Sequence, residues 1–168
     1  HLKTLQKLSS KHKADASHAG LLQDITNYQA AMAAPPFTDA QLQRLDTAMY
    51  CLKERAKTLP ELLEKARFIL QTRPISIDEP AQATLDSVFI GILQSLTPQL
   101  QNATWSREHL EVLFHEFVGS NGIKFGQLAA PLRAALAGRK ATPSVYDMMV
   151  LLGRDETIAR IKDAIAES

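Results

Sequence analysis

The residues best suited to chemistry lie between Lys124 and Tyr146, in the stretch KFGQLAAPLRAALAGRKATPSVY. It carries Lys124, Arg133, Arg139 and Lys140 and no acidic residue. The whole chain is nearly neutral, with 19 Lys and Arg against 18 Asp and Glu, so the excess of positive charge is local to this segment. A guanidinium pairs with a phosphate or with the edge or face of a base, and bases are most accessible in single-stranded RNA. We therefore expect the stretch to bind an RNA loop.

Two further basic clusters support the same interpretation. One is Lys3, Lys7, Lys11 and Lys13, and the other is Lys53, Arg55 and Lys57. Each taken alone is equally typical of a solvated helix face, and that alternative stays open. Thr142-Pro143 reads as the start of a helix, whose free N–H groups would attract a phosphate or the edge of a base.

Other chemistry is poorly supported. The five histidines, at positions 1, 12, 18, 109 and 115, include no pair one helical turn apart, and no cysteine cluster joins them, so we expect no metal site. Ser10-Lys11-His12-Lys13 matches an S-x-x-K pattern without its partner motifs. No phosphate-binding glycine loop occurs. Cys51 lies close to an apolar helical stripe and is expected to be a buried, inert thiol. We expect no catalysis by this chain alone.

The elements that must position these residues are predicted to be helices throughout, so the fold class is all-α. Thr38 to Gln41 has the form of a capping box, and Thr58 to Glu61 looks like a second helix start. The proline-rich segment 71–80 is the predicted boundary, giving two small helical subdomains, residues 1–75 and 76–168. No apolar run reaches the ~20 residues that span a bilayer.

The second subdomain is predicted in more detail. Apolar side chains at helical spacing follow Leu85, and Ser106 is a predicted N-cap. We predict a helix interrupted at Pro131 and closed by Gly138, and then a helix capped by Thr142 with Pro143 at its first position. The last helix would bury Ile158, Ile161 and Ile165. Because the chain starts at His1 rather than Met, we expect it to be a fragment.

Two segments carry a resemblance to a known family. The stretch KFGQLAAPLRAALAGRKATPSVYDMMVLLGRDETIARI resembles the closing segment of bacterial glutamyl-tRNA synthetases, with the landmarks K-x-G, P-L-R, A-L-x-G, T/S-P and L-L-G in order. ERAKTLPELLEKARFIL is similar to that family's R-x-x-T-L-x-E-L segment. The similarity covers nearly the whole chain. It implies the carboxy-terminal, helical anticodon-binding region of a class I synthetase, in which two subdomains grip the anticodon loop of the glutamate tRNA.

The resemblance also implies roles for particular residues. Arg55 matches an arginine that reads the first anticodon base and favours cytosine there. Arg133 matches a second arginine that contacts anticodon bases, and Lys124 matches the start of the same segment, as a contact to the RNA backbone. A turn that packs on the last anticodon base corresponds to Thr142, Pro143, Ser144 and Val145.

This turn departs from the family pattern, because Ser144 replaces a frequent glycine and Val145 a larger apolar residue. Lys53 and Glu54 also differ from the Arg-Pro that precedes the first arginine in some relatives. Discrimination between glutamate and glutamine tRNAs is therefore left open. Trp105 and Tyr146 are interpreted as packing residues.

The family's catalytic signatures, an H-I-G-H-like motif and a K-M-S-K-S-like loop, do not occur. The resemblance thus implies that ATP, magnesium and glutamate are handled by an amino-terminal catalytic region, and that this chain holds no cofactor. It implies a monomeric cytoplasmic enzyme, to which the single cysteine is suited. The alternatives are a helical protein-interaction domain without RNA binding and, less favoured, an independent enzyme.

Overall fold

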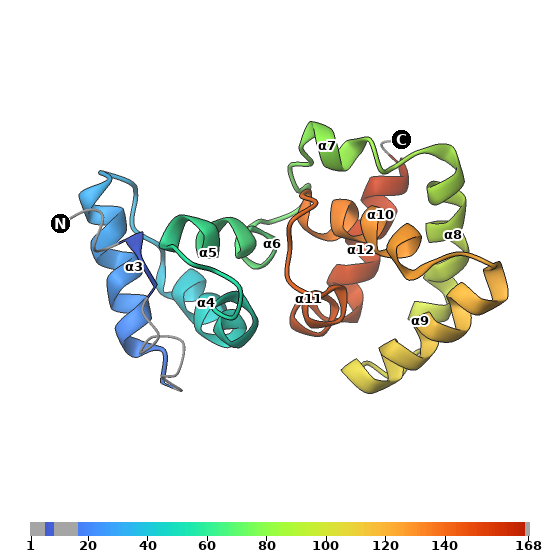
Figure 1. Ribbon diagram of the computed structural model, residues 1–168, viewed down its shortest axis with the longest axis horizontal. Coiled ribbons are helices and arrows are strands. Elements are labelled where there is room, and N and C mark those ends of the chain that lie inside the picture. The colour runs from blue at the N-terminus through green and yellow to red at the C-terminus, as the bar shows by residue number, and fades with distance from the viewer. Residues whose placement is uncertain (1–5, 9–16, 167–168) are drawn as a thin grey trace. The chain divides into compact units, whose positions relative to one another are not determined.

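The computed structural model (Figure 1) describes residues 6–8 and 17–166. The chain divides into two compact units, His1–Leu70 and Gln71–Ser168, whereas the sequence pattern placed the division after residue 75. Within the described residues the only β pairing is an isolated bridge between Lys7 and Thr58, and every other regular element is a helix. The all-α prediction is confirmed. The basic residues Lys3, Lys11 and Lys13, and the S-x-x-K pattern at 10–13, lie outside the described residues.

The first unit contains α3 (Ala19–Ala31), α4 (Asp39–Leu52), α5 (Leu59–Lys65) and α6 (Arg67–Leu70). Both predicted caps are present. Thr38 Oγ1 accepts from the Gln41 N–H at 3.2 Å while Gln41 Oε1 accepts from the Thr38 N–H at 2.9 Å, which is a complete capping box. Thr58 caps α5 by a single bond, in which its Oγ1 accepts from the Glu61 N–H at 3.3 Å. These caps fix where two helices start, because they satisfy N–H groups that have no partner inside the helix.

The core of the first unit follows the apolar stripe predicted for α4. Leu45, Met49 and Leu52 are fully buried, and Cys51 is 9% exposed with its thiol donating to the Ala48 carbonyl, so the prediction of a buried thiol is confirmed. Leu21 and Ile25 of α3 are also buried. Met32 is 50% exposed, because α3 ends at Ala31 and Met32 is its C-cap.

The second unit contains six described helices: α7 (Glu79–Gln82), α8 (Ser87–Gln101), α9 (Arg107–Asn121), α10 (Phe125–Ala137), α11 (Val145–Leu152) and α12 (Arg154–Ala166). Helix α10 packs against each of the other helices of this unit and lies at its centre (Figure 1). Its buried residues include Leu128, Leu132 and Leu136 together with small alanines, which allow neighbouring helices to approach closely. This unit therefore positions α10 from all sides.

Three predictions about the second unit were wrong in detail. Helix α10 is not interrupted at Pro131 but continues to Ala137, since tertiary packing holds it and the carbonyl that proline leaves unpaired belongs to the exposed Gln127. The helix predicted to run from Leu85 starts at Ser87, capped by Asp86, and its Val88 is 67% exposed.

The N-cap of α11 is Ser144, whose Oγ accepts from the Tyr146 N–H, and not Thr142. The start of α11 thus lies two residues further along the chain than predicted.

No described helix is both long and apolar enough to cross a membrane. Across the described ranges, no three His, Cys, Asp or Glu side chains are grouped so that they could hold a metal ion.

Candidate nucleic-acid interface

Arg133 lies in the middle of α10 on a helix that is otherwise largely buried. Its side chain is half-buried, and burial lowers the pKa of its guanidinium because desolvation penalises the charged form. It makes no hydrogen bond or ion pair with the described part of the chain. A half-buried cation without a partner carries a desolvation cost, and an incoming phosphate or base edge would offset that cost.

Arg139 follows α10 directly but is engaged with the protein. Its Nη1 donates to the carbonyl oxygens of Gly138 at 2.8 Å and Ser76 at 3.3 Å, and its Nε lies 3.6 Å from a carboxylate oxygen of Asp78. The guanidinium therefore fixes the segment before α7 to the end of α10. Of the two arginines in the positive stretch, Arg139 is held by these contacts, whereas Arg133 has no partner among the described residues.

The two lysines of the stretch are exposed. Lys124 is the N-cap residue of α10, and its backbone N–H donates to Gln127 Oε1 at 2.8 Å, which leaves the ammonium group in solvent. Lys140 is exposed in the loop that follows Arg139. Both side chains are suited to long-range attraction of a phosphate backbone.

The segment Thr142 to Val145 is positioned by its own hydrogen bonds and by burial. Thr142 Oγ1 donates to the Pro143 carbonyl at 2.8 Å, and Pro143 is buried. Val145 is 1% exposed, so its side chain belongs to the core. Thr142 and Ser144 are half-buried and are the members of this turn whose side chains reach the surface.

Arg55 lies in the first unit, in the bend between α4 and α5. It is exposed and makes no hydrogen bond or ion pair with the described residues. Asp46, which could have paired with it, lies 3.6 Å from His18 instead. The bend is held by two hydrogen bonds at Lys57. Its N–H donates to Glu61 Oε2 at 2.9 Å, and its carbonyl accepts from the Leu8 N–H. Arg55 is therefore a cation without a partner among the described residues, on a fixed turn.

The predicted residues fall into two sets. Lys124, Arg133 and the turn at 142–145 belong to α10 and to the loop between α10 and α11, within the second unit, whereas Arg55 belongs to the first unit. Each set is built on a capped helix terminus or a packed helix. The predicted residues therefore occur in both units, each described by itself.

Trp105 and Tyr146 are held in packing contacts, as predicted. Trp105 Nε1 donates to the Met149 carbonyl at 2.9 Å, and the Arg154 guanidinium lies over its ring. Tyr146 packs against Phe114 and Phe125, with ring centroids 5.3 and 5.9 Å away. Burial raises the pKa of the Tyr146 hydroxyl, so it stays neutral.

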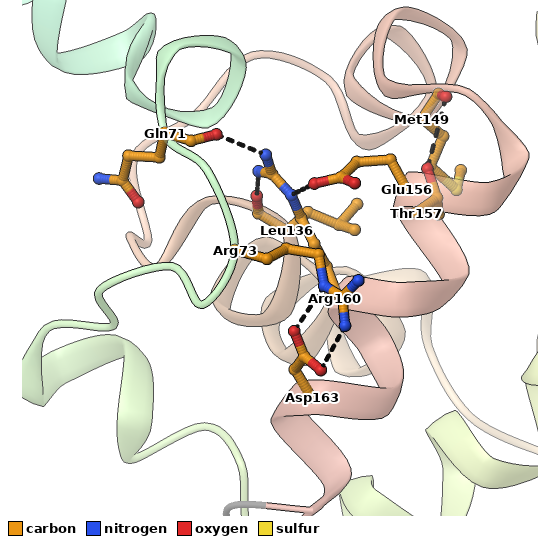
Figure 2. Close-up of polar contacts among 8 residues, drawn as sticks. All are labelled: Gln71, Arg73, Leu136, Met149, Glu156, Thr157, Arg160 and Asp163. Atoms are coloured by element: carbon orange, nitrogen blue, oxygen red, sulfur yellow. Dashed lines mark hydrogen bonds and ion pairs between the residues drawn. The ribbon is translucent and has the colours of Figure 1, made fainter.

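The sequence interpretation missed Arg160, which is 3% exposed on the inner face of α12 (Figure 2). Its guanidinium donates to the carbonyls of Leu136 at 2.7 Å and Gln71 at 2.9 Å and to Glu156 Oε1 at 2.9 Å. A signal was available in its spacing, because the buried residues of α12 include Thr157, Arg160, Ile161 and Ala164. These positions have the i, i+3, i+4, i+7 spacing of a core stripe, with one charged member.

The chain matches the family described as "Anticodon binding domain" over residues 20–165. It is 58% identical over 163 residues to glutamate–tRNA ligase 2 of Ruegeria pomeroyi, a match that covers 97% of this chain and 35% of the relative. It is 54% identical over 164 residues to glutamate–tRNA ligase 1 of Cereibacter sphaeroides, covering 98% and 35%. The chain thus spans about 35% of the length of these relatives.

A solved structure of a glutamate tRNA ligase from Elizabethkingia meningosepticum superposes with a TM-score of 0.68 and 25% identity, covering 89% of this chain and 29% of that one. These relatives give no support to a helical protein-interaction domain without RNA binding.

Proposed function

We propose that this chain, which belongs to the anticodon-binding-domain family, binds the anticodon loop of the glutamate tRNA as the anticodon-binding region of a glutamate–tRNA ligase. The observation that carries the proposal is Arg133, a half-buried guanidinium without a partner in the described chain, on the helix at the centre of the second unit. Such a group gains most from a ligand with phosphate or base acceptors.

Arg133, Lys124 and the turn 142–145 of the second unit, and Arg55 of the first, receive roles in this proposal. Arg133 contacts anticodon bases, and Lys124 contacts the RNA backbone from the start of α10. In the turn from Thr142 to Val145, Pro143 and Val145 are buried, so the last anticodon base would meet the turn's backbone and the side chains of Thr142 and Ser144. Arg55 reads the first anticodon base and favours cytosine, for which its exposed guanidinium, unpaired within the described chain, is suited.

The proposal assigns the chemical reaction to a different region of the enzyme. Ligation of glutamate, with ATP and magnesium, is assigned to a catalytic region outside the third of the relatives that this chain matches. The enzyme would act in the cytoplasm as a monomer, with the glutamate tRNA and its own catalytic region as the partners of this chain.

Binding of the 168-residue chain to anticodon stem-loops tests the proposal. Two stem-loops would differ only at the first anticodon base, C or U, and a third with a scrambled anticodon would serve as the control. We expect tighter binding of the C form, weaker binding of the scrambled loop and a marked loss of affinity as salt rises, since each phosphate contact releases counterions. No binding, or binding that ignores both salt and anticodon, would overturn the proposal.

A further inference from the structure

Arg160 links the end of α10 to the first residue of the second unit through hydrogen bonds to two backbone carbonyls. Leu136 lies in the last turn of α10, where carbonyl groups have no partner within the helix, and Arg160 Nη1 donates to its oxygen at 2.7 Å. Arg160 Nη2 donates to the carbonyl of Gln71, the first residue of this unit, at 2.9 Å. Glu156 orients the same guanidinium through its Nε (Figure 2).

The segment 71–78, here called the connector, is fastened along its length. Arg73 makes two hydrogen bonds to Asp163 of α12, at 2.7 and 2.8 Å. Further along, the Asp78 N–H donates to the Gly138 carbonyl at 2.9 Å. The connector therefore follows α12 and the carboxyl end of α10, and Arg160 is the buried side chain that contacts the connector, α10 and α12 together.

Arg133 lies one turn before Leu136 on α10 and has no partner of its own in the described residues. Its position is set by the position of the helix, and the carboxyl end of that helix is held by Arg160. Since Arg160 is 3% exposed, it does not reach a bound RNA itself.

We infer that Arg160 is a positioning residue for RNA binding: through the Leu136 and Gln71 carbonyls it holds α10, and with it Arg133, in register with the connector through which the first unit is attached. The inference rests on the proposed function. Without Arg160, the buried Leu136 carbonyl and the part-buried Gln71 carbonyl each lose this donor, and the end of α10 is free to shift relative to the connector. Arg133 then contacts the anticodon less favourably although it is itself unchanged.

The test is a double-mutant cycle in the 168-residue chain, with affinity for the C-anticodon stem-loop measured well below each variant's melting temperature. Arg133→Gln in the wild-type background should weaken binding roughly 5- to 150-fold, as for one base-reading arginine. Arg160→Gln should weaken binding about fivefold or more, and Arg133→Gln should then cost clearly less than it does in the wild type. Lys162→Gln, which removes an exposed charge from the same helix, should bind as the wild type does.

The outcomes distinguish a failure of the proposed function from a failure of the positioning role of Arg160. A wild-type chain that fails to bind the stem-loop overturns the proposed function, and this inference with it. A folded Arg160→Gln chain with wild-type affinity and the full cost of Arg133→Gln overturns the positioning role alone. If Arg160→Gln does not fold, Arg160→Lys decides by the same cycle, since lysine keeps the charge but lacks the fork that reaches both carbonyls.

Discussion

Gly138 lies so close to Ser76 that a β-carbon added to it would stand 1.9 Å from the Ser76 carbonyl oxygen. Gly138 also has φ of 70°, in the left-handed region, where it ends α10. The contact brings the connector against the end of the helix that carries Arg133. A glycine at this position is therefore required twice, by the backbone angle and by the close approach.

Replacing Gly138 by alanine should destabilise the second unit strongly. The left-handed angle costs an alanine about 1 kcal/mol, and displacing the Ser76 backbone adds to that, for a total of about 2–4 kcal/mol in the free energy of unfolding. Urea unfolding followed by circular dichroism would measure it.

Gly122 provides the matched control. It has φ of 61° at the end of α9, but nothing lies within 4 Å of an added β-carbon. Gly122→Ala should cost only about 1 kcal/mol, from the backbone angle alone. Equal losses for the two variants would show that the contact with Ser76 contributes nothing.

The two arginines around the end of α10 should respond differently to the same substitution. Arg133→Gln removes a guanidinium without a described partner, so it should lower affinity for the stem-loop roughly 5- to 150-fold and leave the melting temperature nearly unchanged. Arg139→Gln removes donors from the Ser76 and Gly138 carbonyls and should lower the melting temperature.

Calorimetry and titration of the two variants, at one salt concentration, separate the roles. The assignment of Arg133 to RNA contact fails if Arg133→Gln binds as tightly as the wild-type chain, or if its only effect is a lower melting temperature.

Arg55→Gln should alter base preference rather than stability. Arg55 is exposed and unpaired in the described chain, so its removal should leave unfolding unaffected. If it reads the first anticodon base, the variant should lose about 1–3 kcal/mol against the C stem-loop and shift its preference toward U. The ratio of the two affinities is the measurement, and an unchanged C/U ratio would falsify the role.

The sequence predicted the helices and their caps better than it predicted long-range polar contacts. Thr38, Thr58 and Ser106 were recognisable because capping depends on residues three apart along the chain. Pro131 was misread because local propensity favours a break there, while packing of α10 against every other helix of its unit overrides it.

In the candidate site, too, local sequence signals were readable and long-range contacts were not. The spacing around Arg133 and the family resemblance pointed to Arg133. Nothing local distinguishes it, however, from Arg139, which is held in part by Ser76 and Asp78, more than sixty residues away in sequence. Arg160 binds carbonyls 24 and 89 residues away, and backbone carbonyls carry no sequence signature.

Thr38→Ala should destabilise the first unit by about 1 kcal/mol, because the Gln41 N–H loses its acceptor at the start of α4. Thr47 gives the control within the same helix: it is exposed, and its hydroxyl bonds only the Gln43 carbonyl of the preceding turn. Thr47→Ala should be neutral or slightly stabilising, since alanine has the higher helix propensity. Thermal unfolding of both variants checks the difference, and equal losses would argue against a specific capping effect.

The pair Arg73 and Asp163 should contribute stability that depends on pH. The hydrogen bonds from Arg73 hold the pKa of the Asp163 carboxyl below its ordinary value of about 4. A lowered folded-state pKa means that the stabilisation is complete above the unfolded-state pKa and is lost as the pH falls through the folded-state value. A double-mutant cycle with Arg73→Gln and Asp163→Asn should therefore show favourable coupling at pH 7 that decreases as the pH falls below the ordinary carboxyl value of about 4.

Because Arg73 is exposed and Asp163 is partly exposed, the coupling should also weaken in 1 M salt, where charges are screened within about 3 Å. Coupling that is unchanged both by acid and by 1 M salt would mean that the two side chains interact through packing and not through the ionised carboxylate.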